Sequence, residues 1–285
     1  MAKLGSWGLD RVIRSRLHDA VATLDGVVHS DSYGRTRDEL EVTLDAIHLC
    51  ADFFQVAASL PDEPIGPAVS ELAISLQGSL TGTNAARRAR EYLSQYWVGT
   101  LLTLANVEPR ILPEGLGSKR PDFLLDLGGL DCAIEVKRPE SFNSMRDALD
   151  RAAWQLRSFG RPGVICLDLT DCICIPGFAT GFIDGPIPIA DRVAPVFKRK
   201  TEVLSDRPSH YNQSDKYARV IALVLFARVA GWRGTPDLQP EARYLLQLPT
   251  YATACQGLVT DFTERLKRLV LTGFERMTGS ASQPL

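Results

Sequence analysis

Three side chains that could act together on a charged ligand, Asp122, Glu135 and Lys137, lie in one short stretch, residues 120–140. The stretch is interrupted by Gly128-Gly129, and Gly-Gly favours a two-residue hairpin turn because glycine tolerates positive φ angles. Counting outward from that turn sets Asp122 opposite Glu135. Side chains alternate along a strand, so Lys137 should share the face of Glu135. The spacing therefore predicts two carboxylates and one ammonium on one face of a β-hairpin.

Directly opposed carboxylates repel each other, because their Cβ atoms are only about 4.5–5.5 Å apart, unless a positive charge lies between them. A divalent cation fits this position, and Mg²⁺ prefers oxygen ligands of this kind. Mn²⁺ is expected to substitute for it. Lys137 could position or help to deprotonate a water molecule. Asp126 and Asp131 also face each other, but at the hairpin tip, where solvated acids are the simpler interpretation.

The opposite face of this hairpin is apolar. It is expected to carry Phe123, Leu125, Leu127, Leu130, Cys132, Ile134 and Val136. The sequence thus predicts one core face and one face that holds the acids.

Pro121-Asp122 and Glu135-Val136-Lys137 resemble the motif of the PD-(D/E)xK phosphodiesterase superfamily, the restriction-endonuclease-like nucleases. The resemblance implies that Asp122 and Glu135 bind the metal ion, that the Val136 carbonyl is a further ligand, and that Lys137 assists the attacking water. It also suggests Glu91 as an acid on the first core helix. Gln155 would be the glutamine of a Gln-x-x-x-Tyr motif on the second helix, although Phe159 replaces the tyrosine.

The elements around the motif follow the order that this resemblance implies. Hydrophobic spacing and breaker residues predict a helix over 84–105, three short strands within 107–113, 121–127 and 130–138, a helix over 145–159 and a buried strand over 163–169. Ser144 is the expected N-cap of the second helix and Gly160 its stop. The predicted fold class is α/β, a restriction-endonuclease-like αβββαβ core with a mixed sheet, preceded by a helical N-terminal region.

Outside this core, residues 1–80 show helical spacing over 9–24 and 39–54. This region is expected to grip substrate, to regulate, or to dock a partner. Residues 81–285 are assigned to the nuclease-like domain. Beyond the core we expect a helix over 194–204, strands over 218–229 and 242–250, and a closing helix over 258–271.

The formal net charge of −2 means that a polyanion would have to be held by local basic residues. The candidates for nucleic-acid contacts are Arg87, Arg88, Lys119, Arg120 and Arg138, with Lys198–Lys200 as a further basic run. Such runs are often only solvated faces.

The six cysteines, at 50, 132, 166, 172, 174 and 255, lack the spacing of zinc or disulfide frameworks and are interpreted as reduced core residues. No leader or sufficiently long apolar run is seen, so we expect no membrane contact and a cytoplasmic location.

Taken together, these observations predict a Mg²⁺-dependent nuclease, with DNA favoured over RNA by resemblance alone. Roles in restriction, anti-phage defence or repair are open. The chain carries no helicase or ATPase motif, so a separate ATPase or regulatory subunit is a reasonable partner, and a homodimer is left open. The alternative is a catalytically silent module that binds nucleic acid or protein on the same fold.

Overall fold

The computed structural model describes the fold over ten segments of the chain. These are residues 16–29, 37–59, 84–112, 120–126, 129, 131–173, 189–205, 217–233, 239–251 and 259–278. The chain divides into two compact units. Unit 1 comprises Met1–Trp97, Ile173–Val193 and Arg228–Arg243, and unit 2 comprises Val98–Cys172, Ala194–Ala227 and Tyr244–Leu285. The first part of the predicted core helix, up to Trp97, therefore groups with the N-terminal helices.

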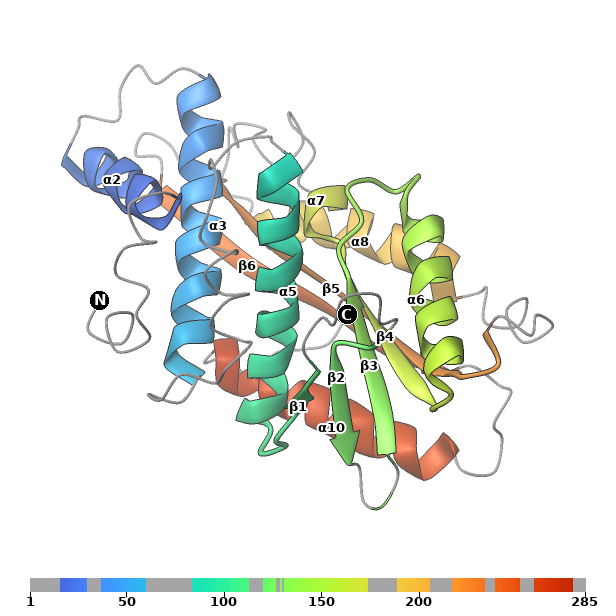
Figure 1. Ribbon diagram of the computed structural model, residues 1–285. Coiled ribbons are helices and arrows are strands. Elements are labelled where there is room, and N and C mark those ends of the chain that lie inside the picture. The colour runs from blue at the N-terminus through green and yellow to red at the C-terminus, as the bar shows by residue number, and fades with distance from the viewer. Residues whose placement is uncertain are drawn as a thin grey trace. The chain divides into compact units, whose positions relative to one another are not determined.

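The strands form a mixed sheet with the order β1-β2-β3-β4-β5-β6 (Figure 1). The strands are β1 (Arg110–Ile111), β2 (Phe123–Asp126), β3 (Asp131–Lys137), β4 (Gly163–Asp168), β5 (Val220–Arg233) and β6 (Gln239–Tyr251). The first three pair antiparallel, whereas β4 is parallel to both β3 and β5. The predicted α/β class and mixed sheet are confirmed.

Helices precede, interrupt and follow the strands. They are α2 (Arg16–His29), α3 (Arg37–Ser59), α5 (Asn84–Leu104), α6 (Met145–Phe159), α7 (Thr170–Ile173), α8 (Ile189–Ser205) and α10 (Val259–Thr278). The order α5-β1-β2-β3-α6-β4 is the predicted one. Among the described residues, no helix is long and apolar enough to cross a membrane.

The second core helix, α6, begins and ends at the predicted residues, but the predicted N-cap hydrogen bond of Ser144 is not formed. The Ser144 side chain makes no capping hydrogen bond, because its Oγ instead accepts the Ser141 N–H at 3.1 Å, while its hydroxyl donates to the Ser141 carbonyl at 2.9 Å. The predicted N-cap interaction is therefore wrong. The stop is as expected: Gly160 has a left-handed φ of 79° and donates its N–H to the Arg157 and Leu156 carbonyls.

Both faces of β3 are buried over its central residues, including the face that was predicted to hold the acids. Ala133 and Glu135, on the predicted acidic face, are fully buried. The reason is that helices cover the sheet on each side. A Cβ on Gly99 of α5 would lie 3.3 Å from the Phe123 ring, and a Cβ on Gly163 would meet the side chain of Leu156 on α6.

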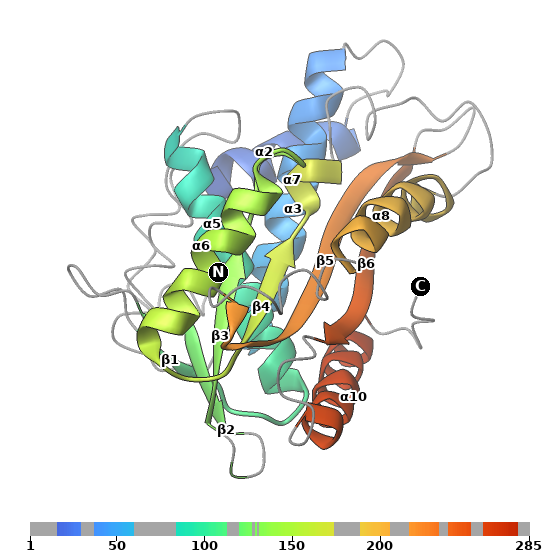
Figure 2. The ribbon, with the colours of Figure 1, turned by 90° about the vertical axis from the view of Figure 1, so that its right-hand side faces the viewer.

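These contacts also show which helix covers which face. Gly163 pairs with Ala133, so Ala133 and Glu135 share the face beneath α6, whereas Ile134 pairs with Phe123 and faces α5. Figure 2 shows α6 running along β3 and β4, and both strands contact it. The face of β3 that carries the acid is thus enclosed by α6.

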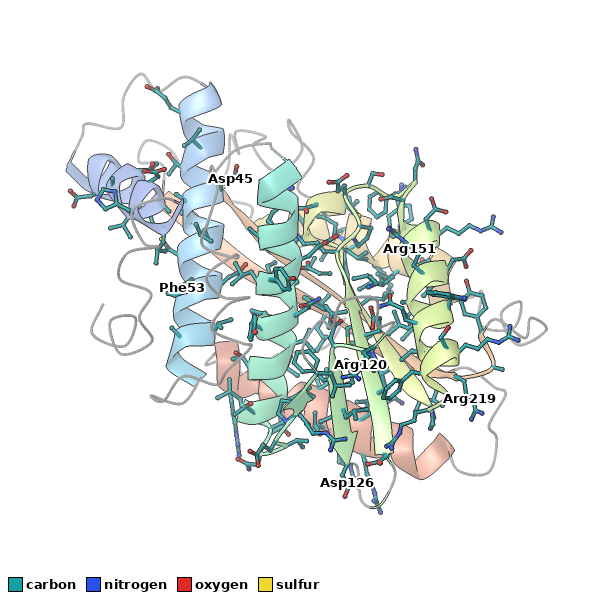
Figure 3. The ribbon with its side chains drawn as sticks, in the orientation of Figure 1. Asp45, Phe53, Arg120, Asp126, Arg151 and Arg219 are labelled. Carbon is teal, nitrogen blue, oxygen red and sulfur yellow. The ribbon has the colours of Figure 1, made fainter. Side chains whose placement is uncertain are left out.

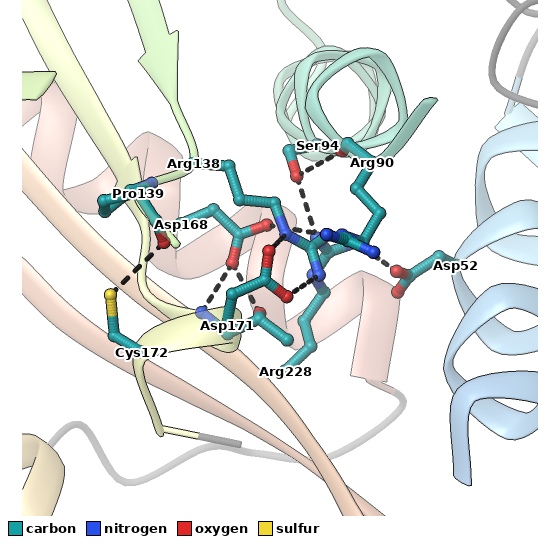
Figure 4. A network of polar contacts seen from close by, with 10 residues as sticks. Asp52, Arg90, Ser94, Arg138, Pro139, Asp168, Asp171, Cys172 and Arg228 are labelled. Atoms are coloured by element: carbon teal, nitrogen blue, oxygen red, sulfur yellow. Dashed lines mark hydrogen bonds and ion pairs between the residues drawn. The ribbon is translucent and has the colours of Figure 1, made fainter. Parts of the chain in front are cut away.

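A buried arginine, Arg228, links β5 to α3 and α5 within unit 1. The Arg228 guanidinium, on β5, is buried, pairs with Asp52 on α3, and donates to the Ser94 hydroxyl on α5 at 3.0 Å (Figure 4). It also lies over the Trp97 ring, 5.6 Å from the centroid. A buried arginine needs such partners because an unpaired buried charge is strongly unfavourable.

Candidate functional site

The hairpin of β2 and β3 has the predicted register. Phe123 pairs with Ile134, Leu125 with Cys132, and Asp126 with Asp131. Gly129 has a φ of 92°, as the turn requires, and donates its N–H to Asp126 Oδ1 at 2.7 Å. Gly128, Leu127 and Leu130 lie outside the described residues. Counted one step beyond the paired residues, the register sets Asp122 opposite Glu135.

Asp122 is half-buried and is tied to β3 by two hydrogen bonds. Its N–H donates to the Ile134 carbonyl at 2.9 Å, and its Oδ2 accepts the Val136 N–H at 2.7 Å. A strand residue turns its N–H and C=O toward the same neighbouring strand. The Val136 carbonyl, the predicted backbone ligand, is therefore directed to the side on which Asp122 lies.

Glu135 and Lys137 form an ion pair within β3. The Lys137 ammonium contacts Glu135 Oε1, with the Lys137 side chain 24% exposed and that of Glu135 at 0%. The alternation of the strand thus places both groups on one face, as predicted. It also means that the positive charge beside Glu135 is supplied by Lys137 in this structure.

The Cys166 thiol on β4 lies close enough to both acids for their charges to affect it. Burial is the main cause that raises the pKa of Cys166, and the charges of Asp122, Cys132 and Glu135 raise it further. Cys166 pairs with Val136 in the β3–β4 register. Both carboxylates therefore act electrostatically on one point next to the middle of the motif.

A second ion-pair cluster lies directly after Lys137. Arg138 donates to Asp171 through Nε at 2.9 Å and through Nη2 at 2.7 Å, and its Nη1 is 3.5 Å from Asp168 Oδ2 (Figure 4). Asp168 Oδ1 accepts the Thr170 N–H at 3.0 Å. Because β3 and β4 are parallel, this cluster joins their carboxyl ends, the edge at which open α/β sheets commonly bind ligands.

Arg138 had been predicted as a nucleic-acid contact. Its guanidinium is instead buried and ion-paired with two carboxylates, Asp168 and Asp171. This geometry indicates a structural role and adds no support for a contact with nucleic acid. Asp168 and Asp171 were not predicted as part of the site. Their only sequence signal is their position at the end of an apolar strand.

The other two predicted catalytic residues, Gln155 and Glu91, lie on helices. Gln155 is half-buried on α6, and within the described segments no hydrogen bond joins it to Asp122, Glu135 or Lys137. Glu91 is half-buried on the part of α5 that belongs to unit 1. Both stay predictions.

The predicted basic contacts are described only in part. Arg120 is exposed beside the motif (Figure 3). The side chains of Arg87 and Arg88, and the whole of Lys119, lie outside what the structure describes.

The hairpin-tip acids have structural partners. Asp126 holds the turn through Gly129, and Asp131 pairs with Arg161, which agrees with their interpretation as surface acids. Figure 3 labels Asp126 at this tip.

Comparison with models of protein families, with curated proteins and with solved structures finds no match for this chain. Among the described residues, no group of three or more His, Cys, Asp or Glu side chains could hold a metal ion. The candidate centre offers the carboxylates of Asp122 and Glu135 as side-chain donors. Mg²⁺ is often held by one or two carboxylates, with substrate oxygens and water completing its shell.

Proposed function

We propose that this chain is a metal-dependent nuclease that hydrolyses phosphodiester bonds, with a restriction-endonuclease-like core and Asp122, Glu135 and Lys137 as its catalytic residues. One observation carries the proposal: the register of β2 and β3, which brings an aspartate, a glutamate and a lysine to one end of one hairpin. The element order α5-β1-β2-β3-α6-β4 supports the same assignment.

The donor set fits a hard divalent cation. Asp122 and Glu135 would hold Mg²⁺, or Mn²⁺ in its place, with the Val136 carbonyl as a third oxygen ligand. A carboxylate has two oxygens with about four lone-pair sites, so Glu135 can keep its contact with Lys137 and still ligate. When bound, the metal ion would supply Lewis acidity at the phosphoryl oxygens and lower the pKa of a water molecule.

The chain's own groups would do the rest. The Lys137 ammonium is held against Glu135 and is partly exposed, so it can reach a water molecule while its position is fixed from the buried side. There it would orient the attacking water and offset the negative charge that develops on the phosphorus oxygens. Asp122 is oriented by the Val136 N–H, which stabilises its ionised form.

The biological setting follows from resemblance only. DNA is the favoured substrate, the cytoplasm the favoured location, and restriction, anti-phage defence or repair the favoured roles. A separate ATPase or regulatory subunit, or a second copy of the chain, would act as partner. Residues 1–80 would grip substrate, regulate or dock that partner, and residues 81–285 would form the nuclease domain.

One observation favours the alternative, a catalytically silent module that binds nucleic acid or protein. Glu135 is fully buried and ion-paired with Lys137, an arrangement that a purely structural pair would also have. The two functions differ in whether metal and phosphodiester cleavage depend on this pair.

The test compares wild type with Glu135→Gln and Lys137→Ala on plasmid DNA, single-stranded DNA and RNA, each with Mg²⁺, Mn²⁺ or EDTA. We expect cleavage that needs the metal ion and that falls at least about 100-fold in either variant, as for other transition-state stabilising groups. Glu202→Gln, at an exposed site on α8, is the matched control and should cleave like wild type.

Calorimetric measurement of Mn²⁺ affinity distinguishes a substitution that removes a metal ligand from one that does not. Glu135→Gln should weaken it at least about tenfold, whereas Lys137→Ala should not. Nucleic-acid binding that is independent of metal, with no cleavage and no change in either variant, would establish the silent module instead.

A further inference from the structure

The solvent-facing side of α6 carries an exposed tryptophan. Trp154 is 42% exposed, and Val21 is the other large hydrophobic residue that stands out in this way among the described residues. The rest of the apolar surface of α6 is buried against the sheet. Trp154 therefore lies outside the buried stripe of α6, and part of its ring is accessible from solvent.

Arginines surround Trp154. Arg151 and Arg157 are exposed and lie three residues before and after it, so they are its neighbours on the helix surface. Arg161 follows the helix end, with its guanidinium carbon 6.0 Å from the Phe159 centroid. Arg219 is also exposed. Its carbonyl accepts the Gly163 N–H at 2.8 Å, which places it beside the C-terminal end of α6 (Figure 3).

Acidic side chains also lie near this face, and two of them have hydrogen-bond or ion-pair partners, one of which is Arg161 itself. Asp150 accepts a hydrogen bond from the Tyr217 hydroxyl, and Asp131 pairs with Arg161. Asp147 is exposed in the first turn of α6, where Arg146 is exposed as well. Arginines therefore outnumber acids on this side, and the surplus charge is complementary to a polyanion.

The chemistry of this surface is specific in two respects. Arginine binds phosphate through a planar fork of donors, and an exposed indole ring offers a stacking platform for a base. A duplex keeps its bases stacked on one another, so an unpaired strand is the form of nucleic acid that can use both.

We propose that the arginine–tryptophan face of α6, formed by Arg151, Trp154, Arg157 and Arg161, binds an unpaired stretch of a nucleic-acid strand, with a base stacked on Trp154 and the arginines on its phosphates. The choice of ligand rests on the proposed nuclease function. Because α6 covers the face of β3 that carries Glu135, the bound strand would lie along the layer that encloses the candidate centre.

The test measures binding of a fluorescent single-stranded DNA oligonucleotide by anisotropy in EDTA, over a series of salt concentrations. Trp154→Ala should weaken binding roughly 5- to 150-fold, the range for loss of one base–aromatic stack, and Trp154→Phe should restore most of it. Arg151→Gln with Arg157→Gln should reduce the slope of log K against log salt by roughly 1.4, because each phosphate contact to a single strand contributes about 0.7.

The matched control removes the same charge elsewhere. Arg265→Gln with Arg268→Gln, both exposed on α10, should leave affinity and salt slope unchanged. Equal weakening in this control, or wild-type affinity in Trp154→Ala, overturns the proposal. A change in oligomeric state of Trp154→Ala on sedimentation, without a change in oligonucleotide binding, assigns the face to a protein contact instead.

The two proposals fail in different ways. If wild type binds the strand through this face in EDTA but cleaves nothing with Mg²⁺, the binding proposal stands and the nuclease proposal is rejected. If wild type cleaves but Trp154→Ala binds the strand like wild type, the nuclease proposal stands and the binding proposal is rejected.

Discussion

At the scale of single residues, Arg138 is the side chain whose loss should cost most stability near the candidate centre. Its guanidinium is buried and bonded to Asp171 and Asp168, so Arg138→Gln would leave two carboxylates without their cation. Removing one partner of a buried pair typically costs about 3–5 kcal/mol. We expect a loss of unfolding free energy of about 3 kcal/mol in urea titrations.

The control for this prediction is an arginine in an exposed pair. Arg161 and Asp131 have side chains 40% and 59% exposed, so Arg161→Gln should change the unfolding free energy by less than about 1 kcal/mol. Equal effects of the two substitutions would show that burial does not set the strength of the Arg138 cluster.

Residue types and spacing were sufficient to predict the hairpin part of the site but not its surroundings. Counting from Gly128-Gly129 gave the register that places Asp122 near Val136 and Glu135. The burial of Glu135 could not be predicted this way, because it depends on β4 and α6, which are distant in sequence. For Arg228 the signal was present: one charged residue within an apolar strand implies a buried partner.

At the scale of elements, the crossing of α10 and α5 depends on a glycine. A Cβ at Gly273 would lie 2.1 Å from the Leu101 carbonyl oxygen, which is backbone and cannot turn aside. Gly273→Ala should therefore force the helices apart. Overpacking of this kind typically costs about 1–3 kcal/mol, which would appear as a lower urea midpoint.

Gly26 provides the same substitution without the clash. It lies inside α2 with nothing within 4 Å of an added Cβ, so Gly26→Ala should stabilise by up to about 1 kcal/mol through helix propensity. A stabilising Gly273→Ala would contradict the close approach of α10 to α5.

Elements were predictable where a local signal defines them. The bounds of α6 follow from its hydrophobic spacing and from Gly160, which has the left-handed conformation that ends a helix. The Ser144 cap was wrong because a local bond to Ser141 competes for the hydroxyl. The exposed Trp154 is visible in the sequence only once the buried stripe of α6 is known.

At the scale of the whole molecule, the division into two units was not predictable from the chain. Each unit combines segments far apart in sequence, and β5 contributes to both. Hydrophobic spacing identifies helices and strands but carries no information on which of them pack together. The contacts that fasten each unit, such as Arg228 with Asp52, are long-range and side-chain specific.

The buried thiols make the stability of the molecule fall in alkaline solution. Burial raises the pKa of Cys132 from 9.0 to about 12 and that of Cys50 to about 11, and it raises the pKa of Cys166 as well. The fold therefore favours the neutral thiol. This contribution is complete below pH 9, where the unfolded thiols are also neutral, and is lost as the pH rises toward the raised values.

At about pH 10.5 each such thiol should lower the unfolding free energy by roughly 1–2 kcal/mol relative to pH 8, because ionisation is favoured only in the unfolded chain. Urea titrations across this range measure the slope. Cys132→Ala, although less stable at pH 8 because of the cavity it leaves, should lose less stability between the two pH values than wild type. An identical slope in this variant would mean that Cys132 ionises as readily in the folded chain as in the unfolded one, which its full burial opposes.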